Sequence, residues 1–122
     1  MTSKLFKNGT LVTPGGKRRE DFLVRDGKIV KIGENLEEEG AEVVDLNGKF
    51  VLPGVIDVHV HLREPGGEEK EDFESGTMAA AAGGVTFVLD MPNNSPAVIS
   101  REELAAKRAL VEPKAKVNFD LY

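Results

Sequence analysis

The fold is decided by one stretch of the chain, Pro53-Gly54-Val55-Ile56-Asp57-Val58-His59-Val60-His61. Its second half alternates strictly between apolar and polar residues, a period that predicts a β-strand. Successive side chains of a strand point to opposite faces, so His59 and His61 should share one face, with their Cα atoms about 6.5–7 Å apart. Asp57 and Arg63 have the same parity, and we expect the four side chains to form one polar stripe if the strand runs that far.

Beyond this strand, helix and strand patterns alternate. We expect a helix over Glu71–Ala82, a strand over Val85–Met91, a helix that Ser100 opens and Pro113 closes, and a strand over Val117–Leu121. Acidic residues in the first turn and alanines in the body favour the first helix, and a capping box of Ser100 and Glu103 favours the second. The second strand is almost continuously apolar, which predicts burial on both faces. Together these segments predict a parallel α/β sheet.

Before this strand, residues 1–52 are predicted to form short strands joined by tight turns. Asx-Gly pairs occur at Asn8-Gly9, Asp26-Gly27 and Asn47-Gly48, and β-branched or aromatic residues flank each pair. Such pairs supply the positive φ angles that two-residue hairpin turns require. We therefore expect a small antiparallel β-rich unit over residues 1–52 and a second domain over residues 53–122.

The composition excludes several classes of protein. Hydrophobic residues make up 40% of the chain and charged residues 30%, a profile typical of folded globular domains. The net charge of −5 argues against nucleic-acid binding, which needs clustered cations. There is no cysteine for disulfides or thiolate metal ligands, and no apolar run approaches the roughly 20 residues of a membrane span. The first residues lack the apolar core of a signal peptide, so we expect a cytoplasmic protein that binds neither nucleic acid nor membrane.

The two histidines are candidate metal ligands. The carboxyl end of a strand is where α/β proteins build their sites, and polar side chains gathered there need a partner. A catalytic zinc normally takes three protein ligands, whereas the chain offers two imidazoles. Asp90 is the one carboxylate placed to be a third, but an aspartate near a turn more often accepts hydrogen bonds from local amides. We therefore expect further ligands from outside these residues; the alternative is a metal-free strand with polar outward positions.

Several motifs resemble those of one enzyme family. The stretch from Pro53 to His61 is similar to the first barrel strand of the amidohydrolase superfamily. Four further stretches resemble one narrower group, the dihydroorotases: Leu62-Arg63-Glu64-Pro65-Gly66, Glu71–Thr77, Ala79–Thr86 and Asp90-Met91-Pro92-Asn93-Asn94-Ser95-Pro96. The resemblance covers nearly the whole chain. It implies the N-terminal portion of a (β/α)8 barrel, with three strands and two helices over residues 53–122, preceded by part of a composite β-sandwich over residues 1–52.

The resemblance also implies an activity, the zinc-dependent reversible hydrolysis of (S)-dihydroorotate to N-carbamoyl-L-aspartate in pyrimidine biosynthesis. It implies that His59 and His61 bind one or two Zn²⁺ ions, and that Arg63 and Asn93 bind the substrate carboxylate. A guanidinium holds a carboxylate at two points, and an amide adds an oriented donor. Asp57 is implied to orient a ligand without binding metal. No catalytic residue is expected within the chain, so the 122-residue chain alone should be inactive, with the proton-shuttling aspartate and the other ligands beyond Tyr122.

Two other functions stay open on the sequence. An allantoinase or hydantoinase-like cyclic amidohydrolase is one, although allantoin and simple hydantoins lack the carboxylate that Arg63 and Asn93 would bind. A non-catalytic dihydroorotase-like scaffold that binds aspartate transcarbamoylase is the other, although a scaffold has no need of the polar stripe. Besides the substrate, the expected partners are the rest of the barrel or a complementing chain, aspartate transcarbamoylase, and further copies of the full-length protein.

Overall fold

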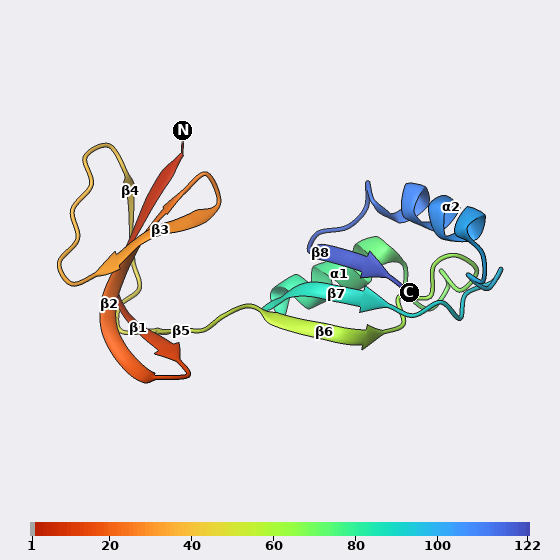
Figure 1. Ribbon diagram of the computed structural model, residues 1–122, viewed down its shortest axis with the longest axis horizontal. Coiled ribbons are helices and arrows are strands. Elements are labelled where there is room, and N and C mark those ends of the chain that lie inside the picture. Colours follow the sequence, from red (N-terminus) through yellow and green to blue (C-terminus); the bar gives the residue numbers. More distant parts are fainter. Residues whose placement is uncertain (1) are drawn as a thin grey trace. The chain divides into compact units, whose positions relative to one another are not determined.

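The computed structural model describes residues 2–122, which form two compact units (Figure 1). The first unit ends at Pro53 and the second runs from Gly54 to Tyr122. The division falls where the sequence changes from short paired strands to alternating strands and helices. Over residues 2–122, neither helix is long and apolar enough to cross a membrane.

The first unit is a five-stranded mixed β-sheet. Its strands are β1 (Ser3–Thr13), β2 (Gly16–Arg25), β3 (Lys28–Gly33), β4 (Glu42–Asp45) and β5 (Phe50–Val51). The pairs β1–β2 and β2–β3 are antiparallel, whereas β4 and β5 both lie parallel to β1. The expected antiparallel unit is therefore wrong in part, because residues 34–41 return the chain toward the start of β1 before β4 begins.

Only one of the three Asx-Gly pairs forms the expected hairpin. Asp26-Gly27 joins β2 to β3 with φ angles of 49° and 77°, as a type I′ turn requires. Asn8-Gly9 instead lies inside β1 at a β-bulge, where the Asn8 N–H donates to Asp21 Oδ1 at 3.0 Å. The hairpin between β1 and β2 turns at Pro14-Gly15, and Asn47-Gly48 connects β4 to β5, which run in the same direction. The hairpin predictions at residues 8–9 and 47–48 are therefore wrong, because a positive φ angle serves a bulge or a bend equally well.

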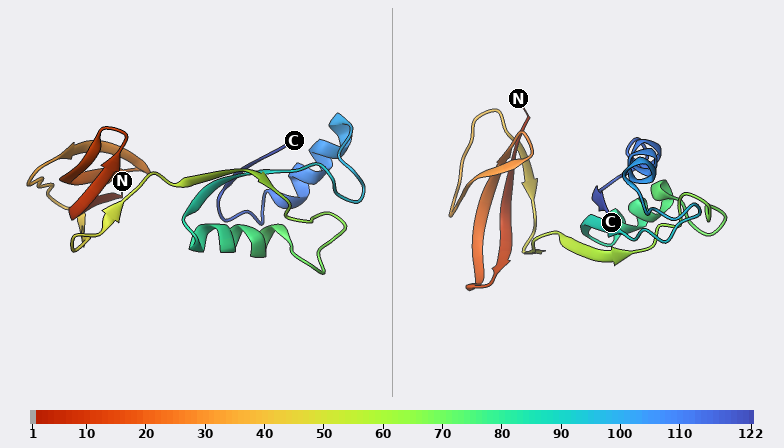
Figure 2. Two further views of the ribbon diagram at one scale, coloured as in Figure 1. Left: turned by 90° about the horizontal axis from the view of Figure 1, so that it is seen from below. Right: turned by 45° about the vertical axis from the view of Figure 1, so that its right-hand side comes forward.

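The second unit contains a three-stranded parallel sheet and two helices. Its elements are β6 (Val55–Val60), α1 (Phe73–Ala82), β7 (Val85–Asp90), α2 (Arg101–Val111) and β8 (Asn118–Leu121). The strands pair in chain order, β6-β7-β8, each parallel to the next (Figure 1, with two further views in Figure 2). The expected parallel α/β sheet is confirmed. The assignment of this sheet to a barrel stays a prediction.

One apolar cluster holds the second unit together. Phe73 from α1 and Val111 from α2 pack in the same cluster as Val88 of β7, so both helices cover the same face of the sheet. Phe87 and Leu89 alternate with Val88 and are only half-buried. In the described residues the two helices cover the face of Val88, and the expected burial of the opposite face stays a prediction.

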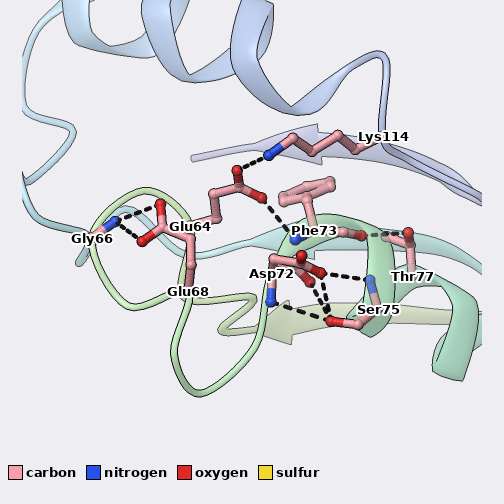
Figure 3. A network of polar contacts seen from close by, with 8 residues as sticks. All are labelled: Glu64, Gly66, Glu68, Asp72, Phe73, Ser75, Thr77 and Lys114. Carbon is pink, nitrogen blue, oxygen red and sulfur yellow. Dashed lines mark hydrogen bonds and ion pairs between the residues drawn. The ribbon is translucent and has the colours of Figure 1, made fainter.

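The start of each helix is fixed by a capping residue. Asp72 Oδ1 accepts the Ser75 N–H at 2.7 Å, and Ser75 Oγ accepts the Asp72 N–H at 3.3 Å, which closes a capping box on α1 (Figure 3). Ser100 caps α2 as expected, by accepting the Glu103 N–H. The other half of the expected box is wrong, because the Glu103 carboxylate accepts the Ile99 N–H at 2.9 Å.

Asp72→Ala is expected to destabilise the second unit in a pH-dependent way. Hydrogen bonds from the Ser75 hydroxyl, and then from its N–H, hold the pKa of the Asp72 carboxyl below its ordinary 3.8. The carboxylate's stabilisation is therefore fully present above about pH 4 and is lost as the pH falls through the lower folded-state pKa. Urea unfolding at pH 7 and pH 3 should show the wild-type advantage over Asp72→Ala shrinking at the lower pH.

Asp72→Asn is the matched control for this comparison. Its amide oxygen still accepts the Ser75 N–H and does not titrate, so its advantage over Asp72→Ala should be the same at both pH values. A wild-type advantage that does not change with pH would contradict the assigned role of the carboxylate.

Candidate metal and anion site

The imidazoles of His59 and His61 lie on one side of the chain at the end of β6. Their ring centroids are 5.2 Å apart and the ring planes make an angle of 67°. Val60 and Leu62 alternate with the histidines and pack in the core of the second unit, so the two rings lie on the face opposite that core. The expected convergence of the two imidazoles is confirmed, while their role as metal ligands stays a prediction.

The expected stripe of four polar side chains does not form. Asp57 Oδ1 accepts the N–H of His59, two residues further along the strand, at 3.0 Å, so its carboxylate is engaged by the backbone. At the other end β6 stops at Val60, and Arg63 has a φ angle of 62°. The parity of an extended strand ends at such a residue, which explains why Arg63 leaves the stripe.

His61 is joined to the loop that follows β7. Its Nδ1 lies 2.7 Å from Asn93 Oδ1. An amide oxygen is only an acceptor, so a neutral imidazole that makes this contact donates from Nδ1 and has the lone pair of Nε2 open for a cation. The Asn93 amide nitrogen is then left to donate elsewhere. Sequence reasoning missed this bond, although the carboxyl ends of neighbouring parallel strands lie at the same edge of a sheet.

Arg63 and Asn93 line the same small pocket. It has a volume of about 170 Å³, and its wall includes Gly66, Gly67, Lys70 and Ser95. The two sides of the pocket are tied together by the Ser95 N–H, which donates to Pro65 O at 3.1 Å. A guanidinium and an amide donor on one pocket suit a small carboxylate. The pairing of Arg63 with Asn93 expected from the sequence is thus present in space, and carboxylate binding stays a prediction.

A buried glutamate anchors the loop that carries Arg63. Glu64 Oε2 accepts the Phe73 N–H at 2.9 Å, in the first turn of α1, and Oε1 forms an ion pair with Lys114 (Figure 3). A negative charge is favoured at a helix N-terminus, and the hydrogen bond to Glu64 raises the pKa of Lys114. Sequence reasoning missed Glu64, because its partners lie 9 and 50 residues further along the chain.

Asp90 does not serve as a third metal ligand. Its Oδ1 accepts the Leu62 N–H at 2.8 Å, and its Oδ2 lies 2.5 Å from Lys107 Nζ. Asp90 binds a backbone amide as expected, but the expectation that this amide is local is wrong, because Leu62 lies 28 residues earlier in the chain. Over residues 2–122, no three His, Asp or Glu side chains come together in a way that could hold a metal ion. Two imidazoles fit zinc as nitrogen donors, and they supply two of the three protein ligands that a catalytic zinc usually has.

Gly66→Ala is expected to push apart the two loops that form the pocket. A Cβ atom at residue 66 would lie 2.2 Å from the Ser95 carbonyl oxygen, and the φ angle of Gly66 is +90°. Strain and overlap together should lower the free energy of unfolding by about 2–4 kcal/mol. Urea denaturation of the variant measures this loss.

Gly84→Ala separates the two causes. Gly84 has a φ angle of +84°, but an added Cβ would meet nothing within 4 Å. Its loss should be about 1 kcal/mol, from the backbone conformation alone. Equal losses in the two variants would mean that residues 66 and 95 are not in close contact.

Known proteins with similar sequences and structures are enzymes that act on cyclic amides. The model of the family described as Dihydro-orotase-like matches residues 48–122. A dihydroorotase of Bacillus cereus (strain B4264) is 52% identical over 115 residues, which are 93% of this chain and 27% of that protein. A dihydroorotase of Bacillus thuringiensis (strain Al Hakam) is 51% identical with the same coverage. The chain thus spans about a quarter of the length of the curated relatives it matches.

Solved hydantoinases have the same fold over nearly all of the chain. An L-hydantoinase (dihydropyrimidinase) from Arthrobacter aurescens superposes with a TM-score of 0.89 at 33% identity, covering 100% of this chain and 28% of that one. A D-hydantoinase superposes with a TM-score of 0.86 at 41% identity, covering 98% and 26%. Each unit therefore has a backbone fold found in part of these larger enzymes.

Proposed function

Because the chain belongs to the Dihydro-orotase-like family, we propose that it supplies two zinc ligands and the carboxylate-binding pair of a dihydroorotase. The reaction is the reversible hydrolysis of (S)-dihydroorotate to N-carbamoyl-L-aspartate, a step of pyrimidine biosynthesis. One observation carries the proposal: two imidazoles 5.2 Å apart lie beside a pocket lined by a guanidinium and an amide, and Asn93 belongs to both. A site of this kind offers a cation and an anion position next to each other.

Each of these side chains has a distinct task in the proposed site. His59 and His61 hold the zinc, which when bound supplies Lewis-acid polarisation of the ring amide. Asn93 fixes the His61 ring through Oδ1, and its amide NH₂ donates to the substrate carboxylate. Arg63 presents a planar fork of donors to the same carboxylate and so orients the ring. Asp57 fixes the backbone of His59 through the 3.0 Å hydrogen bond to its N–H.

We propose further that the second unit is the first part of a (β/α)8 barrel. Three parallel strands in chain order with both helices on one face support this, since in a barrel every helix lies on the outer face. The face of His59 and His61 is then the inner one. The missing zinc ligand and the aspartate that moves the proton would come from strands outside these 122 residues, and the sheet of the first unit would form part of a composite sandwich.

Hydrolysis of a hydantoin ring is the second candidate, which the likeness to solved hydantoinases favours. Simple hydantoins carry no carboxylate, so Arg63 and Asn93 would have no anionic group to bind. A guanidinium aimed at an empty subsite costs affinity, because its own hydration is lost without replacement. The pocket of Arg63 and Asn93 therefore favours dihydroorotate.

A substrate comparison tests the proposal. The protein as its gene encodes it, loaded with zinc, should open dihydroorotate and close N-carbamoyl-L-aspartate, with kcat/KM at least about 100-fold higher than for dihydrouracil or hydantoin. The matched pair is dihydroorotate and dihydrouracil, which differ by the carboxylate alone. Equal kcat/KM for these two would contradict the assignment of Arg63 and Asn93, and preference for hydantoin would support the second candidate.

A further inference from the structure

An ion pair between Asp90 and Lys107 is buried next to the candidate site. Each side chain is 1% exposed, and the Lys107 Nζ lies 2.5 Å from Asp90 Oδ2. Removing two charges from water costs about as much free energy as their attraction returns, so a buried pair adds little net stability compared with apolar residues. Its presence in the core of the second unit therefore calls for another reason.

Both partners of the pair bind to the segments that carry the site. Asp90 Oδ1 accepts the N–H of Leu62, the residue after His61, at 2.8 Å. Lys107 Nζ donates to Met91 O at 3.2 Å and to Asn94 Oδ1 at 2.5 Å, so it holds the chain on both sides of Asn93. One pair of charges thus connects the end of the histidine strand to the loop after β7.

The contact between His61 and Asn93 tolerates little displacement of the two segments. The His61 Nδ1 to Asn93 Oδ1 contact is 2.7 Å long, and a shift of the loop by about 1 Å would break it. Two backbone hydrogen bonds also join the two segments: the Met91 N–H donates to Val60 O at 2.9 Å, and the Ser95 N–H donates to Pro65 O at 3.1 Å. They lie on either side of Asn93, and neither contacts it. The side chain of Lys107 adds a constraint between them, at Met91 O and Asn94 Oδ1.

We propose that Asp90 and Lys107 are positioning residues, which hold His61 and Asn93 in register so that one imidazole nitrogen faces the metal and one amide faces the carboxylate. This inference rests on the proposed function of the site. Neither residue touches substrate or metal. The ion pair sets the geometry of the site, and apolar residues in its place would keep the fold but lose that geometry.

The test uses three variants of the protein as its gene encodes it. Lys107→Met alone leaves a buried carboxylate without its cation and is expected to lower the melting temperature. The double variant Asp90→Asn/Lys107→Met removes both charges and should recover most of that loss. Arg108→Met is the matched control, since Arg108 is the next residue of α2 and pairs with the exposed Asp120.

The kinetic readout separates positioning from stability. In the double variant we expect KM for N-carbamoyl-L-aspartate to rise, and zinc affinity to fall, by about 10- to 100-fold, the effect typical of residues that orient metal ligands. Arg108→Met should keep both values. ¹⁵N NMR of the imidazoles should also show that the Nδ1-protonated form of His61 loses its population in the double variant.

The outcomes distinguish this inference from the proposed function. A stable double variant with unchanged KM, zinc affinity and His61 tautomer would overturn the positioning role while leaving the dihydroorotase proposal intact. A wild-type protein that neither binds zinc nor turns over either substrate would contradict the proposed function, and with it the site that the pair is proposed to position.

Discussion

Replacing His61 by alanine in the protein as its gene encodes it should reduce dihydroorotate turnover by about 1,000-fold or more. Removing a residue that only orients a metal ligand typically costs 10- to 100-fold, and removal of a ligand should cost more. The same change frees Asn93, since His61 Nδ1 is its partner at 2.7 Å. His61→Ala should therefore lower zinc content and kcat together, which metal analysis and steady-state kinetics would measure.

The fold of this variant should survive. The two imidazoles lie on the face opposite the core that Leu62, Phe73 and Val88 form. Circular dichroism and the melting temperature of the zinc-free protein should thus match the wild type closely. His59→Ala is expected to behave in the same way, except that the contact between His61 and Asn93 is not affected. Full zinc content with normal kcat in either variant would remove that histidine from the site.

Arg63→Met should raise KM for N-carbamoyl-L-aspartate by about 100-fold, which corresponds to about 2.8 kcal/mol of binding free energy. The guanidinium would provide two charged hydrogen bonds to the carboxylate, and methionine keeps the apolar length of the side chain without them. Zinc content should not change, because Arg63 lines the pocket that it shares with Asn93, and neither imidazole is part of that lining. Kinetics with dihydroorotate and N-carbamoyl-L-aspartate measure this effect.

Arg63→Lys is the matched control for charge. A lysine keeps the positive charge but not the planar fork, so it should restore part of the affinity and not all of it. If Arg63→Met left KM unchanged, the pocket of Arg63 and Asn93 would have no part in carboxylate binding. The two variants together show whether charge or geometry dominates.

The second unit could be predicted closely because its signals are local. The Ala-rich run before Gly83-Gly84 and the cap at Ser100 each act within one helical turn. The strand of residues 55–60 could be predicted from the alternation of apolar and polar residues. The alternation also predicted that His59 and His61 share a face. Local preference was enough for these features, since nothing elsewhere in the chain competes with it.

The first unit was harder because strand partners are not a local property. Asn8-Gly9 and Asp26-Gly27 favour the same positive φ angle, yet one is a bulge and the other a hairpin. What decides between them is Asp21, whose carboxylate accepts the N–H groups of Asn8 and Leu36. Such contacts exist only after the chain has folded, and the parallel pairing of β4 with β1 is of the same kind.

In the candidate site, too, local features could be predicted from the sequence and contacts between distant residues could not. Its residue types and their strand ends could be found in the sequence, but the bond from His61 to Asn93 and the buried charges of Glu64 and Asp90 could not. Their partners lie on other elements, 9 to 50 residues away in the chain. Arg63 left its expected stripe because its φ angle is 62°, and it lies between the buried side chains of Leu62 and Glu64.

The proposed site requires that the two imidazoles hold a single ion while Asn93 fixes one of them. Anomalous diffraction from zinc-loaded crystals of the protein as its gene encodes it is the direct measurement. We expect a zinc peak about 2.0–2.1 Å from Nε2 of both His59 and His61, with Nδ1 of His61 still on Asn93. A peak that touches only one histidine, or that replaces Asn93 at Nδ1, would contradict the account.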